Sequence, residues 1–165
     1  MRDKWYFFER GGIIKRNVCL MVIFAALLAG NVWAATQTVS YQVSAGVDDG
    51  FAQSGGVQDI ASSYLKIGDD RTYAVPYQMA AMRFNNVDIP RSASISYARL
   101  NIQTLNSGLN GQIYGIIQAE AADNAADFSS RMIGSAVRTT AAISWDHKFK
   151  WDSNVTLGSP NISSA

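Results

Sequence analysis

Residues 82–104, MRFNNVDIPRSASISYARLNIQT, constrain the fold most, because they hold two apolar runs on either side of a proline. Pro90 has a fixed φ and no amide donor, so the pattern predicts a turn over residues 88–92. After the turn, Ala98, Leu100 and Ile102 alternate with polar residues, which is the period of a half-buried strand. Ile95 is out of phase with them by one residue, and a β-bulge would reconcile the two phases. The segment therefore predicts strand, turn and strand in a β-sandwich.

Short strand-like runs recur along the chain after residue 34, with turn residues between them. Such spacing is typical of an antiparallel sandwich or barrel. In residues 37–43 the side chains of Val39, Tyr41 and Val43 share one face. Further strands or extended segments are predicted over 64–67, 73–87, 112–119 (apolar on both faces) and 139–145, with loops at 46–56 and 106–111, one or two helical turns within 120–130, and a polar tail after residue 151. The predicted fold class is all-β, an antiparallel, jelly-roll-like β-sandwich.

The first 34 residues have the pattern of an export signal. A net positive leader precedes an uninterrupted apolar run of 13 residues, Val18 to Gly30, and Val32-Trp33-Ala34 fits a cleavage site. The run is shorter than the roughly 20 residues that span a bilayer as a helix. We expect a helical signal peptide over 1–34, cleaved after Ala34, and a β-sandwich domain over 35–165. An uncleaved signal anchor is the alternative.

Removal of the leader changes the charge of the chain. It takes five of the 14 basic residues and two of the 13 acidic ones, which leaves nine against eleven, a net charge of about −2. Nucleic-acid affinity needs clustered Lys and Arg, so nucleic acid is excluded as a partner, and so is an anionic membrane surface. The only cysteine, Cys19, leaves with the leader. The composition predicts a bacterial protein that is secreted, periplasmic or on the cell surface, with no membrane association after cleavage.

A family resemblance rests on three stretches of the sequence. The first has Arg83-Phe84, Val87-x-Ile89-Pro90 and Ala93-x-Ile95-x-x-Ala98-x-Leu100, and the others are residues 118–128 and 138–145. Together they resemble the jelly-roll domains grouped with DNRLRE-type carbohydrate-binding modules of bacterial secreted proteins. Similar domains continue past the element that corresponds to residues 160–164, so the resemblance implies that C-terminal strands are missing here. Unpaired strand edges would then allow self-association.

The sequence offers little for catalysis and predicts a protein that is not an enzyme. His147 is the only histidine, and no Gly-x-Ser-x-Gly motif surrounds any serine. Transition-metal sites need clustered His or Cys, which the chain lacks. Calcium prefers carboxylate and carbonyl oxygens, and two Gly-containing loops carry paired carboxylates. The candidate calcium ligands are Asp48, Asp49, Asp69 and Asp70, and the alternative is that they are turn formers.

Aromatic side chains near predicted strand ends are the candidate binding platform. Sugars present flat C–H faces that lie on Tyr and Trp rings. The candidates are Tyr73, Tyr77, Trp145 and Trp151, with core packing as the alternative for Trp145. We therefore expect a non-catalytic extracellular module that binds polysaccharide or a cell-surface glycan, or that serves adhesion. Two alternatives stay open: the accessory N-terminal fragment of a larger secreted hydrolase, and a structural subunit that assembles by strand addition.

Overall fold

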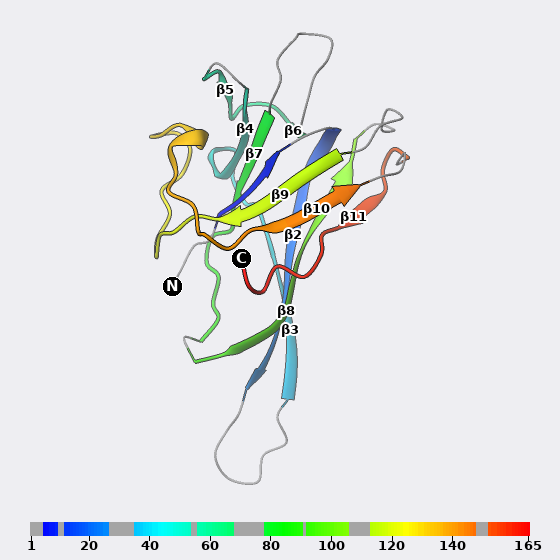
Figure 1. The fold of residues 1–165 in the computed structure, drawn as a ribbon, viewed down its shortest axis with the longest axis vertical. Helices are drawn as coiled ribbons and strands as arrows, with labels where there is room; N and C mark the ends of the chain where they lie inside the picture. The colour runs from blue at the N-terminus through cyan, green and yellow to red at the C-terminus, as the bar shows by residue number, and fades with distance from the viewer. Residues whose placement is uncertain are drawn as a thin grey trace.

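The computed structural model describes residues 5–9, 12–26, 35–53, 56–67, 78–90, 92–105, 113–147 and 152–165. Strands dominate these ranges (Figure 1), and the short helical turns are of the 3-10 type. The strands are β1 (Trp5–Glu9), β2 (Gly12–Ala26), β3 (Ala35–Gln42), β4 (Asp49–Gln53), β5 (Gln58–Asp59), β6 (Tyr64–Ile67), β7 (Gln78–Arg83), β8 (Ser94–Thr104), β9 (Ile113–Ala119), β10 (Ile143–His147) and β11 (Thr156–Gly158); the 3-10 turns are η1 (Gly46–Asp48) and η2 (Ile133–Ser135). The described ranges contain no helix with the length and apolarity needed to span a bilayer.

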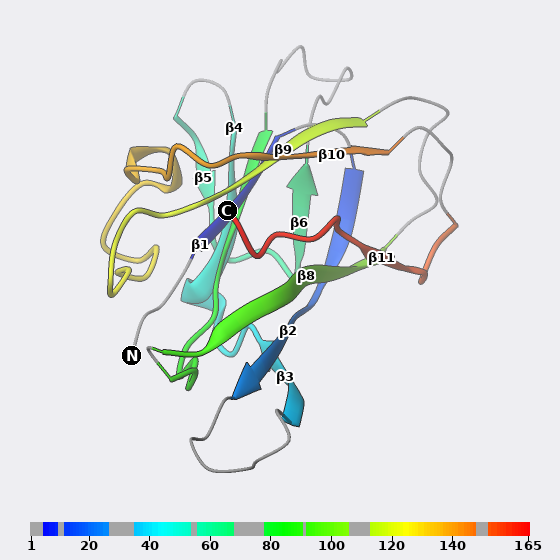
Figure 2. The same cartoon turned by 60° about the horizontal axis from the view of Figure 1, so that its bottom comes forward.

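The strands form two sheets, and every strand pairing is antiparallel. One sheet has the order β10-β9-β1-β7-β4-β5, and the other has the order β11-β8-β2-β3, with β6 also paired to β2. In Figures 1 and 2 the ends of β2 and β3 project together beyond the rest of the molecule. The all-β antiparallel prediction is therefore confirmed at the level of the two sheets.

Strand β8 confirms the strand and the bulge predicted from the sequence. Its buried residues alternate at Ala98, Leu100, Ile102 and Thr104. The pairing register with β2 shifts between the partners of Tyr97 and Ile95, which leaves Ser96 as the extra residue of a bulge. Ile95 thereby returns to the inner face and packs against the main hydrophobic cluster.

Both sheets contribute to the main hydrophobic cluster. The six-stranded sheet supplies Met82 and Ile117, among others, and the five-stranded sheet supplies Leu65 and Leu100. From β3, the partly buried Val39, Tyr41 and Val43 pack against it, as the alternation of residues 37–43 predicts. The full set of buried members is Phe51, Leu65, Ile67, Ala80, Met82, Phe84, Ala98, Leu100, Ile102, Ile117, Ala119, Trp145 and Ile162.

A second, smaller cluster covers the other face of β7. Ala81 packs there with Ala125, Phe128 and Ile133, so β7 is buried on both faces. The side-chain amide of Gln58 holds this covering segment, because it donates to the carbonyls of Phe128 and Arg131 and accepts from the amide of Ile133. The helical turns predicted within 120–130 are wrong. Tertiary packing of this segment overrides its Ala-rich local preference for helix.

The loop predicted over 46–56 is also wrong, because it contains η1 and β4. Phe51 is buried in the main cluster, while Gly50 pairs with Ala81 and faces the smaller one. A Cβ atom on Gly50 would lie 2.7 Å from the carbonyl oxygen of Asp59. Glycine therefore permits a close approach of two strands here, where the sequence pattern suggested a turn.

The polar tail runs along the outer edge of β8 and supplies hydrogen bonds to it. Short strand β11 pairs with residues 101–103. Beyond it, the side chains of Ser159 and Asn161 accept hydrogen bonds from the backbone amides of Leu100 and Ala98. Sequence reasoning missed this strand. Its Ser and Asn residues satisfy the backbone of a neighbour, so their polarity does not mark a free tail.

The leader contributes strands where a helix was expected. Strand β1 lies between β9 and β7, and β2 lies between β8 and β3. A short apolar run does not distinguish a helix from a fully buried strand. Pairing partners on both sides of each leader segment favour the strand. Cleavage after Ala34 stays a prediction.

Candidate functional site

The paired carboxylates at the start of β4 are both buried. Asp48 and Asp49 are each about 1% exposed. The carboxylate of Asp48 accepts from Arg83 at 3.0 Å and from the side-chain amide of Asn85 at 2.5 Å. Ser44 also donates to it, at 3.4 Å. Asp48 thus joins η1 to the end of β7 through protein donors.

The second predicted acidic pair, Asp69 and Asp70, lies outside the described residues. Among the residues that the structure describes, no three His, Cys, Asp or Glu side chains are grouped to hold a metal ion. The calcium hypothesis stays a prediction. Of the four candidate calcium ligands, Asp48 already forms an ion pair with the guanidinium of Arg83.

A second ion pair closes the segment that covers β7. The guanidinium of Arg131 donates to both carboxylate oxygens of Glu120, at 2.8 and 2.5 Å. It also donates to the carbonyl of Ala126 and lies over the ring of Phe128, 5.5 Å from its centroid. Sequence reasoning missed this pair, because its members are eleven residues apart with no regular structure between them.

Two carboxylates with lowered pKa values anchor turns. Hydrogen bonding from the Ser62 hydroxyl, with the backbone amides of Ser62 and Ala61, lowers the pKa of Asp59. The hydroxyl and amide of Ser129 lower the pKa of Asp127 in the same way. Hydrogen bonds to the charged form favour it, so both groups are ionised at neutral pH. All of these hydrogen-bond donors lie two or three residues from the carboxylate, so Asp59 and Asp127 stabilise local turns.

The four predicted platform residues fall into two groups. Tyr73, Tyr77 and Trp151 lie outside the described residues. Trp145 is 8% exposed and belongs to the main hydrophobic cluster. Its partner in register on β9 is Gly115, which leaves room for the indole beside it. For Trp145 the structure therefore gives the core placement, and the ring does not form an exposed platform.

An exposed aromatic surface lies instead on the opposite face of the same two strands. In β9 the buried residues Gly115, Ile117 and Ala119 alternate with Tyr114 and Ile116, which are 48% and 45% exposed. The sequence predicts a strand over 112–119 that is apolar on both faces, as in the interior of a sandwich; the strand is confirmed over 113–119, but its Tyr114 and Ile116 face is exposed. The strand lies near the end of its sheet (Figure 2), and one face is left to solvent.

Polar residues of β10 complete this surface. Asp146 is opposite Tyr114 in register, and Ser144 is opposite Ile116. Directly opposite residues in an antiparallel pair point to the same face. All four are exposed. We call Tyr114, Ile116, Ser144 and Asp146 the β9–β10 outer face. It combines an aromatic ring and an aliphatic side chain with a carboxylate and a hydroxyl.

The fold and this surface define an all-β protein of antiparallel sheets with a mixed aromatic and polar sheet face. Comparisons with family models, with curated proteins and with solved structures found no match. The resemblance to DNRLRE-type modules therefore stays a prediction from the sequence.

Proposed function

We propose that the chain is a non-catalytic extracellular module that binds polysaccharide or a cell-surface glycan through the β9–β10 outer face. The observation that carries the proposal is the half-exposed pair Tyr114 and Ile116 beside Asp146 and Ser144. Large apolar side chains that are exposed to water are unfavourable, so a ligand that covers them binds with a favourable free energy of apolar burial.

The chemistry of the face suits a sugar. The flat C–H side of a pyranose packs on an aromatic ring, and sugar hydroxyls donate to carboxylates and hydroxyl oxygens. Tyr114 and Ile116 are two residues apart on one strand, which separates them by roughly 7 Å. Both sit on a regular strand, and β10 lies beside it over the whole length of the surface. A ligand would therefore meet a regular two-stranded surface.

We propose further that the two sheets are the layers of a jelly-roll-like sandwich and that the protein acts outside the bacterial cytosol. The supports are the hydrophobic cluster shared by both sheets, the leader pattern over residues 1–34 and the resemblance described above. The absence of a catalytic role is part of the same proposal.

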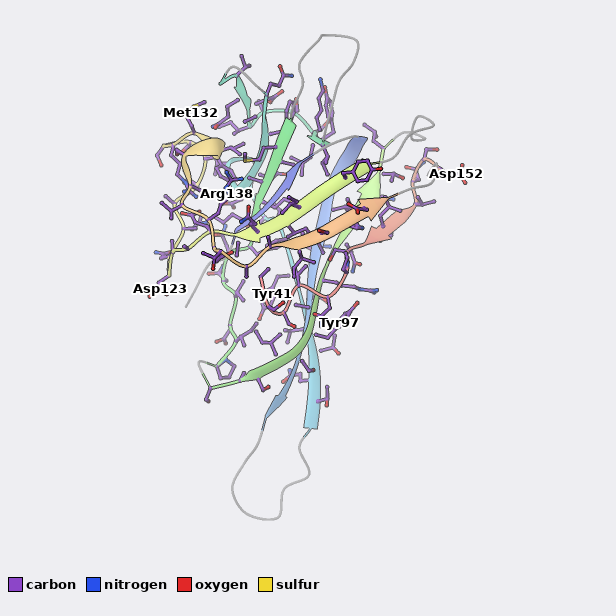
Figure 3. The ribbon with its side chains drawn as sticks, in the orientation of Figure 1. Tyr41, Tyr97, Asp123, Met132, Arg138 and Asp152 are labelled. Carbon is purple, nitrogen blue, oxygen red and sulfur yellow. The ribbon has the colours of Figure 1, made fainter. Side chains whose placement is uncertain are left out.

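Glycan arrays followed by titration of any bound sugar test the proposal. Tyr114→Ala is expected to weaken binding about tenfold, which corresponds to roughly 1.4 kcal/mol for one lost stacking surface. Tyr97→Ala is the matched control, because Tyr97 is a partly exposed tyrosine on β8, in the other sheet (Figure 3). Unchanged far-UV circular dichroism would show that both variants fold.

Two results would contradict the site. One is glycan binding that survives Tyr114→Ala. The other is binding that depends on Trp151 and not on Tyr114, which would return the platform to the position predicted from the sequence. No binding to any glycan by the intact chain would refute the function itself.

A further inference from the structure

Strand β2 holds the five-stranded sheet together. It pairs with β8 on one side and with β3 and β6 on the other. In the described part of the chain, β3 and β6 have no other strand partner. Residues 19–25 are enclosed on both sides, since each pairs with a residue of β3 and all pair with the segment from Asn101 to Ser94. If export processing removes the leader, the sheet loses the strand on which it is built.

Strands β3 and β8 flank β2 and form the two walls of its position in the sheet. Along both walls, apolar residues alternate with polar ones. Leu20 is in register with Leu100 and Tyr41, and Val22 is in register with Ala98 and Val39. These four wall residues are buried or partly buried and belong to the main hydrophobic cluster or pack against it. The odd-numbered positions are in register with residues that carry polar groups: Cys19 with Asn101 and Gln42, Met21 with Arg99 and Ser40, Ile23 with Tyr97 and Thr38, and Ala25 with Ser94 and Thr36.

The leader is more apolar than its neighbours in the sheet require. Directly opposite residues share a face, so the flanking strands favour apolar residues at positions 20 and 22, and on the side of Ile95 also at position 24. Residues 18–26, VCLMVIFAA, are apolar without interruption. An export signal needs such a continuous run, whereas a strand in this position does not. The excess at positions 19, 21 and 23 therefore fits the leader role, and the alternation fits the sheet role.

We propose that the processed chain has an open strand site between β3 and β8 that binds an extended segment of another polypeptide. The inference rests on the exported, processed form proposed above. The donor is uncharged over about seven residues, as residues 19–25 are, and it is apolar at the two positions that meet Leu100 with Tyr41 and Ala98 with Val39. Main-chain hydrogen bonds to both neighbours provide affinity, and the two apolar positions provide specificity.

Paired variants of the full, unprocessed chain test the alternation. Leu20→Thr with Val22→Thr removes the residues that the walls require, and Met21→Thr with Ile23→Thr removes neighbours of similar hydrophobicity. We expect the first pair to lower the melting temperature by about 5–10 °C and the second pair to change it by less than about 2 °C. Equal losses would show that only bulk hydrophobicity matters and would overturn the proposal.

Exchange of the strand tests binding in trans. A protease site placed within residues 27–34 of the full chain allows the leader to be cut after folding. We expect the cut leader to co-elute with the remainder and to be replaced by a labelled peptide of residues 12–26, one per chain. The peptide with Met21→Thr and Ile23→Thr should exchange equally well, and the peptide with Leu20→Thr and Val22→Thr should not.

Three results would overturn the strand site. The first is release of the leader from a remainder that stays monomeric with unchanged strand signal and melting temperature. The second is formation of a defined dimer without added peptide, which would make a second copy the occupant. The third is equal exchange of both variant peptides. Glycan titration of the uncut chain is run in parallel, because its failure refutes the β9–β10 outer face and leaves the strand result unaffected.

Discussion

Gly50 offers a sharp test of the packing between the two clusters. It lies in β4, buried, and pairs with Ala81. A Cβ atom at this position would lie 2.7 Å from the carbonyl oxygen of Asp59, 2.9 Å from Cγ2 of Ile60 and 3.1 Å from Cδ1 of Ile133. The nearest atom belongs to the backbone. Asp59 ends β5 and its side chain holds the following turn, so that oxygen cannot move alone.

The expected magnitude combines two opposing effects. Extra volume in a closed site costs about 1–3 kcal/mol, and two contacts below 3.0 Å place Gly50→Ala in the upper half of that range. Alanine also restricts the unfolded chain, which returns about 0.4–1 kcal/mol where the backbone angles are compatible. We therefore expect the free energy of unfolding to fall by about 1–2.5 kcal/mol.

Urea denaturation of the full chain measures this change. Gly134→Ala is the matched control, since nothing lies within 4 Å of a Cβ atom there. The free energy of unfolding of Gly134→Ala should stay within about 0.5 kcal/mol of the wild type or rise slightly. Equal midpoints for Gly50→Ala and the wild type would refute the close approach of β4 to β5 and η2.

Three further predictions concern polar contacts. Asp48→Ala removes the carboxylate that faces Arg83 and is expected to lower the free energy of unfolding by about 3 kcal/mol in urea denaturation, with a smaller loss for Asp48→Asn. Gln58→Ala removes three hydrogen bonds to residues 128–133 and should cost about 1–3 kcal/mol, with faster amide hydrogen exchange confined to that segment. The folded pKa of Asp59 lies below its ordinary value of 3.8, so its contribution is present above pH 3.8 and is lost as the pH falls through the folded pKa. Urea midpoints between pH 5 and pH 2.5 should therefore fall less steeply for Asp59→Asn than for the wild type, and parallel curves would contradict this assignment.

The sequence predicts the local features of the fold well where the period is clear. The alternation of β8, the bulge beside Ile95 and the inward face of β3 follow from side-chain spacing alone. Strand β4 does not, because Asp48-Asp49-Gly50 has the composition of a turn. Only the approach of β5 and the guanidinium of Arg83 explain why these residues are buried. Those partners lie 9 to 35 residues away and leave no local signal.

The candidate site was harder to predict for the same reason. Residues 112–119 contain apolar side chains on both faces, and nothing local shows which face is covered. The pairing of β9 with β10 assigns Trp145 to the core and Tyr114 to the surface. An interpretation based on aromatic type alone selects the larger ring, and the structure buries it.

Because β2 is synthesised well before β8, the central strand of the five-stranded sheet exists for some time without one of its two neighbours. Its main partner, β8, begins about 70 residues after β2 ends. At roughly 5–20 residues per second, translation leaves the apolar leader without this partner for about 4–14 s. If the leader is an export signal, as proposed, only β3 and β6 compete with the export machinery for β2 during that interval, and afterwards β8 competes as well. For an exported chain, slower translation between Ala26 and Ser94 would therefore favour export over pairing of β2 with β8.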